Sequence, residues 1–132
     1  MNDLLQLISQ YTDFHYHELF VRELSDLIKH ELSGHEREFT RLLIRQLSFI
    51  NNMRSRVDQA DSNEILKHTQ RRFYSIHLTQ KFFNIRFIIF VASDNNAVYF
   101  LSAFYERSGK KKTSYREFEP TLEDRLHDLG GI

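Results

Sequence analysis

The pattern of apolar positions along the chain changes about half-way, from a helical period to a strand period. Over residues 1–65, apolar side chains recur three and four positions apart, which is the spacing of one face of an α-helix. This spacing predicts a short helix that includes residues 4–11, a second helix over 17–32 and a third over 36–59. Residues 58–63 break the pattern and are predicted to form a loop.

Two of the predicted helices have recognisable start signals. Ser33 and Glu36 form the S-x-x-E pattern of a capping box, in which the two side chains satisfy free backbone N–H groups. Pro120 and Thr121, followed by acidic residues, predict the start of a C-terminal helix, because the positive end of the helix dipole favours acids there. We expect this short helix to end at Gly130, a usual helix stop.

From residue 71 onward the period is close to two. Polar and apolar side chains alternate over 73–78, which is typical of a half-buried strand. Residues 82–92 are dense in β-branched and aromatic side chains, and residues 97–106 have a similar composition. The sequence Ser-Asp-Asn-Asn at 93–96 separates these two runs and favours a turn, so they predict a hairpin.

This order of elements predicts an α+β fold: N-terminal helices, a small antiparallel sheet and a short C-terminal helix. A length of 132 residues suits a single domain over 1–132. The absence of cysteine excludes disulfides and thiolate chemistry. No apolar run approaches the roughly 20 residues that span a bilayer. The N-terminus, which carries Asp3, lacks the basic start of a signal peptide, so we expect a cytoplasmic protein without membrane contact.

Charge is unevenly distributed, although the formal net charge is zero. Residues 1–65 hold 7 Lys and Arg against 11 Asp and Glu (7 − 11 = −4), and residues 66–132 hold 11 against 7 (11 − 7 = +4). Within 67–116 the sum is 10 − 2 = +8. Such a basic stretch favours polyanions such as nucleic acid. The alternatives are a solvated basic face and a surface that docks on an acidic protein.

Several kinds of site are not supported by the sequence. His15 and His17 lie two positions apart, and His30 and His35 five apart, whereas the helical pair of a zinc hydrolase lies four apart. Neither glycine-rich nucleotide-binding motif is present, and no G-x-S-x-G elbow occurs. The acidic residues at 117–124 are explained by the start of the C-terminal helix. We therefore predict no metal site and no cofactor.

Four segments of the basic half follow one another in an informative order and spacing. They read RFYSIHL at 72–78, FNIRFIIF at 83–90, VYFLSAFYE at 98–106 and SGKKKTSY at 108–115. Together they resemble the RelE superfamily and, within it, the HigB-like or phage-derived toxins of bacterial type II toxin–antitoxin systems. The resemblance implies a RelE-like toxin core over residues 36–132.

Residues 1–35 exceed this compact core. The resemblance leaves three roles open for such a helical extension: it covers the sheet, it pairs two subunits, or its acidic residues shield the basic face. A second departure from the family is Glu106, which places an acid near the end of the last strand, where relatives carry a basic run.

The resemblance also implies an activity, namely cleavage of messenger RNA, usually on the ribosome, held off by a cognate antitoxin protein. Such endoribonucleases work without a metal ion. A base activates the 2′-hydroxyl, cations stabilise the charge of the transition state, and an acid protonates the leaving 5′-oxygen.

On this resemblance, Arg86 is the candidate phosphate clamp. His77 and Tyr115 are candidates for proton transfer, and Tyr115 also for stacking on a base. Lys110 and Lys112 are candidates for stabilising the transition state. The other basic candidates would contact the RNA backbone: Arg71, Arg72, Lys81, Lys111 and Arg116. Because an unpaired buried arginine is costly, Arg86 either reaches an open face or pairs with a carboxylate on the helices.

Other interpretations stay open at this point. His77 is alternatively a surface histidine, Tyr115 a packing residue, and the lysines at 110–112 a solvated loop. For the whole chain, one alternative is a non-catalytic module that keeps a RelE-like sheet to bind RNA or protein. Another is a ParE-like toxin, which shares the fold but inhibits gyrase.

Overall fold

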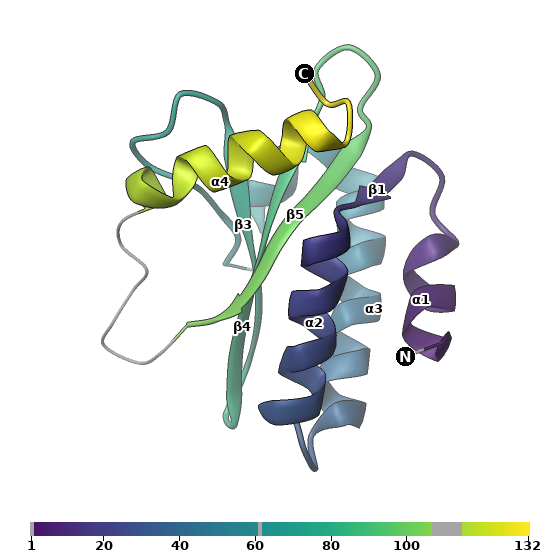
Figure 1. The fold of residues 1–132 in the computed structure, drawn as a ribbon. Helices are drawn as coiled ribbons and strands as arrows, with labels where there is room; N and C mark the ends of the chain where they lie inside the picture. The colour runs from purple at the N-terminus through teal and green to yellow at the C-terminus, as the bar shows by residue number, and fades with distance from the viewer. Residues whose placement is uncertain (1, 61, 107–114) are drawn as a thin grey trace.

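The computed structural model of the chain describes residues 2–60, 62–106 and 115–132 (Figure 1). Its helices are α1 (Asn2–Ser9), α2 (Glu18–His30), α3 (Glu36–Met53), the 3-10 helix η1 (Arg54–Gln59) and α4 (Tyr115–Asp128). Its strands are β1 (Phe14–Tyr16), β2 (Glu64–Ile65), β3 (Phe73–Gln80), β4 (Phe83–Val91) and β5 (Val98–Tyr105). The predicted α+β fold, with helices before the sheet and a helix after it, is confirmed.

The five strands form one sheet in the order β1-β5-β4-β3-β2. Strands β2, β3, β4 and β5 pair with one another in antiparallel fashion, while β1 pairs in parallel with β5. The periodicity over 73–106 predicted the three long strands. It missed β1 and β2, which are three and two residues long and therefore too short to show a period.

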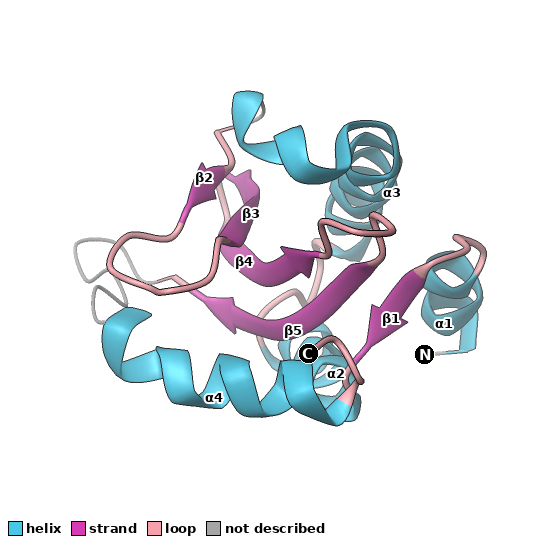
Figure 2. Cartoon of the chain, turned by 90° about the horizontal axis from the view of Figure 1, so that it is seen from above, coloured by secondary structure: helices cyan, strands magenta, loops and turns pink. Residues whose placement is uncertain are grey.

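Helices cover both faces of the sheet, and Figure 2 shows α3 and α4 on opposite sides of it. On one face, α2 and α3 bury Phe20, Leu24 and Leu43 against the sheet. On the other face, Leu122 and Leu126 of α4 are fully buried against a second apolar cluster. Burial on both faces explains why β4 and β5 are apolar at nearly every position rather than at alternate ones.

The structure corrects two predicted helix starts. His35 caps α3 without a side-chain hydrogen bond, so Ser33 and Glu36 do not form the predicted capping box. The chain turns between α2 and α3 at Gly34, whose φ of +85° suits glycine. Helix α4 begins at Tyr115, so that Pro120 lies inside it rather than at its start. The extra turn is held by packing, because Phe118 meets Phe104 edge to face, with 6.2 Å between the ring centroids.

The predicted third helix also divides near its end. At Arg54 the backbone takes a φ of +50°, and the chain continues to Gln59 as the 3-10 helix η1. Arg54 is fixed there by its own side chain, which donates hydrogen bonds to the Asn51 and Asn96 carbonyl oxygens at 3.0 Å each.

The N-terminal 35 residues are part of the common core. Strand β1 adds to the sheet beside β5, and Ile8, Phe14 and Phe20 belong to the same apolar cluster as the long strands. The Tyr16 hydroxyl donates a hydrogen bond to the Ile8 carbonyl oxygen and ties α1 to β1. Helix α2 packs Phe20 and Leu24 into this cluster, and its Glu23 reaches Arg125 of α4 past the edge of β5.

Candidate functional site

Polar side chains gather on the side of the sheet that faces α4, beside the strand ends that α4 does not cross. Arg86 on β4 lies between His77 on β3 and Phe104 on β5 in the cross-strand register. Side chains alternate between the two faces of a sheet, so Ser75, His77 and Arg86 point to the same side. The backbone N–H of Glu106 donates to the Asn84 carbonyl oxygen at 2.8 Å, so Glu106 lies opposite Asn84. Asn84 is two positions from Arg86 on β4 and therefore faces the same side, as does Glu106. We call Ser75, His77, Arg86 and Glu106 the polar cluster.

Arg86 is half-buried in the middle of an apolar strand. Among the residues that the structure describes, it makes no ion pair, and its buried Nε has no hydrogen-bond acceptor. Within this part of the chain, Arg86 therefore does not form the ion pair with an acid on the helices that was one of the two predicted outcomes. A buried N–H group without an acceptor is costly, and such groups often have a functional explanation. The arrangement leaves the Arg86 Nε group available to an anion that binds on this side of the sheet.

Ser75 provides a second buried polar atom with nothing to bind. It is completely buried, and its Oγ has no hydrogen-bond partner within the described part of the chain. Ser75 lies opposite Ile88, which places it diagonally across from Arg86. Diagonal neighbours across two strands are within reach of long side chains. Two unsatisfied polar atoms thus lie close together on one face.

His77 is fixed in position by two buried amides. The backbone N–H of His77 donates to Asn63 Oδ1 at 2.8 Å, and its backbone carbonyl oxygen accepts from Gln46 Nε2 at 2.8 Å. The ring Nε2 lies 3.8 Å from Glu64 Oε1. A carboxylate that faces an imidazole at this distance helps to orient the ring. Glu64 was missed by the sequence analysis because it comes from the two-residue strand β2.

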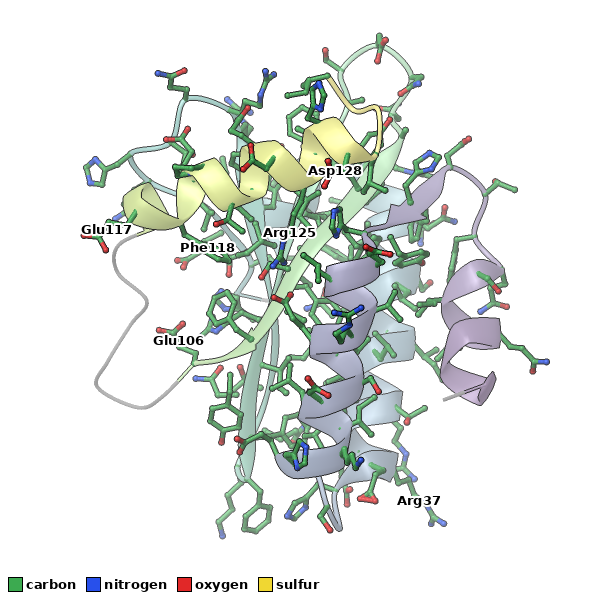
Figure 3. All side chains as sticks on the ribbon, viewed as in Figure 1. Arg37, Glu106, Glu117, Phe118, Arg125 and Asp128 are labelled. Atoms are coloured by element: carbon green, nitrogen blue, oxygen red, sulfur yellow. The ribbon has the colours of Figure 1, made fainter. Side chains whose placement is uncertain are left out.

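Glu106 is buried, with 5% of its surface exposed, directly after β5. It is a diagonal neighbour of Arg86, and Figure 3 shows it below Phe118 near the first turn of α4. The sequence analysis treated this acid only as a departure from a basic strand end. The register instead makes Glu106 a diagonal neighbour of Arg86 on the same side of the sheet, and a carboxylate near a guanidinium suits acid–base chemistry on a phosphate.

The other predicted residues divide into two groups. Lys110, Lys111 and Lys112 lie outside the described residues, as do the side chains of Tyr115 and Arg116, whose backbone forms the start of α4. Lys81 is described and exposed. It lies at the β3–β4 turn, where its Nζ is 5.5 Å from the centroid of the exposed Phe82 ring.

Arg71 and Arg72 lie at the other end of β3 and do not join the polar cluster. Arg71 Nε is 2.9 Å from Glu123 Oε1 and ties the preceding loop to α4. Arg72 is exposed and borders a cleft of about 520 Å³. Burial raises the pKa of Tyr74 in this cleft, and its hydroxyl donates to the Ser55 carbonyl oxygen at 2.7 Å.

No family model, no curated protein and no solved structure matches this chain. The resemblance to RelE- and HigB-like toxins therefore stays a prediction. Among the described residues, no group of three or more His, Asp or Glu side chains is placed to hold a metal ion. None of the helices in that part of the chain has the length and apolar character needed to cross a membrane.

Proposed function

We propose that this chain is the toxin of a type II toxin–antitoxin system and that it cleaves messenger RNA at the polar cluster without a metal ion. The observation that carries the proposal is Arg86, a half-buried cation on the α4 side of the sheet whose buried Nε has no acceptor among the described residues. It is flanked by an imidazole and a carboxylate, His77 and Glu106. These groups supply what transfer of a phosphate to the neighbouring 2′-hydroxyl requires.

In the proposed reaction the scissile phosphate binds Arg86. Glu106 takes the proton from the 2′-hydroxyl as the general base. The 2′-oxygen then forms a bond to phosphorus, and the bond from phosphorus to the 5′-oxygen breaks. His77, facing Glu64 at 3.8 Å, gives its proton to the leaving 5′-oxygen. The products are a 2′,3′-cyclic phosphate and a free 5′-hydroxyl.

The sequence resemblance adds partners and further contacts to this proposal. The lysines at 110–112, together with Tyr115 and Arg116, follow the polar cluster directly in the chain and are proposed to hold the RNA backbone or ribosomal RNA. A cognate antitoxin would hold the activity off, and the cytoplasm is the proposed compartment. The +8 stretch over 67–116 supports a polyanionic substrate.

The test compares induced expression of the unchanged chain, of Arg86→Ala and of Arg22→Ala, a matched control on the exposed side of α2. We expect growth arrest and new messenger RNA ends with 5′-hydroxyls for the unchanged chain and the control, and neither for Arg86→Ala. Purified protein should cleave RNA equally well in excess EDTA. Arrest without RNA cleavage would favour the gyrase route. RNA binding without arrest would favour a non-catalytic binding module.

A further inference from the structure

We infer that the outer face of α3 is a binding surface for the phosphate backbone of RNA and that it leads the strand over the edge of β3 to the polar cluster. The inference rests on the proposed function, because it takes RNA as the substrate. It concerns a helix that none of the candidate residues named above belongs to.

The first observation is the composition of this helix. Helix α3 contains three arginines, and its two acids, Glu36 and Glu38, both lie in the first turn. Arg37, Arg41 and Arg45 are all exposed and lie four positions apart, so they form one row along the helix. Figure 3 shows Arg37 at the end of this row, pointing away from the protein.

The second observation is that Arg37 and Arg41 of this row are not neutralised by any acid in the described ranges. Within the described ranges, Arg37, Arg41 and Arg56 make no ion pair. The other described arginines include well-paired examples, since Arg71 and Arg125 each have a carboxylate at 2.9 Å. Arginines that are not held by protein acids are the groups that contact backbone phosphates.

The third observation decides between RNA and an acidic protein as the occupant. The exposed side of α3 offers polar side chains such as Ser48 and Asn52, and its large apolar residue is Ile44, which is 45% exposed. A stable protein interface has an apolar core with aromatic anchors, which this face lacks. A polar face with a row of cations is the usual form of a backbone-binding surface on nucleic-acid-binding proteins.

A surface hollow connects this face to the candidate site. It has a volume of about 200 Å³ and is lined by Leu42, Arg45, Gln46, Ser62 and His77. Arg45 belongs to the arginine row and His77 to the polar cluster, so the hollow joins the two. An RNA strand that follows α3 therefore reaches His77 at the edge of β3 and Arg86 on the next strand.

The experiment measures binding of a fluorescein-labelled 2′-O-methyl-RNA oligonucleotide, which lacks the nucleophilic hydroxyl and cannot be cleaved. The variant is R37Q/R41Q. The matched control, R22Q/K29Q, removes two exposed cations of α2. We expect the magnitude of the slope of log K against log salt to fall by about 1.4 for the α3 variant, since each lost contact to a single strand contributes about 0.7. The control should change the slope little.

Equal losses in the variant and the control, or no loss in the α3 variant, would overturn the inference. The inference would also be overturned if the α3 variant lost binding to polyglutamate but kept binding to RNA, because this face would then bind an acidic protein. R86A separates the inference from the proposed function: it should lose cleavage but keep most RNA binding. If the unchanged chain binds RNA through α3 and never cleaves it, the proposed function fails while the inference stands.

Discussion

At the scale of single residues, Arg86 is the side chain that packing explains least. A methionine or leucine would fit an apolar strand without leaving a buried N–H group unsatisfied. Natural proteins often keep such unfavourable residues where function needs them, at the expense of stability. The polar cluster fits this pattern, since the buried Ser75 Oγ next to it also has no partner in the described part of the chain.

We therefore predict that Arg86→Met abolishes RNA cleavage while raising the free energy of unfolding by about 1 kcal/mol, because it removes a poorly satisfied buried cation. Urea unfolding followed by circular dichroism measures the stability, and RNA end mapping the activity. Arg22→Met on exposed α2 is the control and should change neither. A large loss of stability in Arg86→Met would mean that the arginine is structural.

Two tyrosines give the stability a pH dependence with a defined sign. Burial raises the pKa of Tyr16 far above its ordinary value of 10.0 and also raises that of Tyr74. Above about pH 10 the unfolded chain loses these protons while the folded chain keeps them, so the unfolded chain binds fewer protons and the free energy of unfolding falls. We expect Tyr16→Phe to flatten this alkaline loss in urea unfolding between pH 8 and 11. An unchanged slope would contradict the assignment.

At the scale of elements, side chains form hydrogen bonds with backbone groups of β3 and β5 at the positions that the short strands β2 and β1 leave unpaired. Beyond β2, Asn63 and Gln46 satisfy the backbone of His77 on β3. Beyond β1, Glu23 of α2 accepts a hydrogen bond from the Ala103 N–H of β5 at 3.0 Å. An edge whose backbone groups are occupied cannot pair with a further strand, so these contacts protect the sheet from association through its edges.

Glu23 also links three elements, since it forms a two-pronged ion pair with Arg125 of α4 at 2.9 and 3.0 Å. The Arg125 side chain is 12% exposed, so removal of its partner leaves a largely buried charge. We predict that Glu23→Ala lowers the free energy of unfolding by about 2 kcal/mol. A double-mutant cycle with Arg125→Met measures the coupling, and additive effects of the two changes would contradict a direct link.

At the scale of the whole molecule, helix α4 closes the second face of the sheet. Leu126 is fully buried there, whereas Leu129 in the following turn is only partly buried. We predict that Leu126→Ala lowers the free energy of unfolding by about 3 kcal/mol, the usual effect of a cavity in a core, and that Leu129→Ala has a clearly smaller effect. Thermal unfolding measures both. Similar effects of the two changes would mean that α4 is loosely docked.

Sequence periodicity was enough to predict the long helices, the long strands and the α+β class, because these features are repeated over many residues. It could not predict β1 and β2, whose pairing depends on residues far away in the chain. The same limit applies to the site: the Glu64–His77 contact and the placement of Glu106 depend on strand register. Charge summed over residues 1–65 also concealed the arginine row of α3, because the acids of this segment, which include Glu36 and Glu38 of α3 itself, outnumber the basic residues.

The parallel pairing of β1 with β5 has a consequence for how the chain is made. Phe14 must pair with Val98, so the first strand leaves the ribosome long before its neighbour has been synthesised. Contacts between such distant segments form late in folding. A nascent chain that ends before β5 thus presents apolar strands with neither a complete sheet nor α4 to cover them. We expect such chains to depend on chaperones, and the polar cluster to assemble only after Glu106 has been translated.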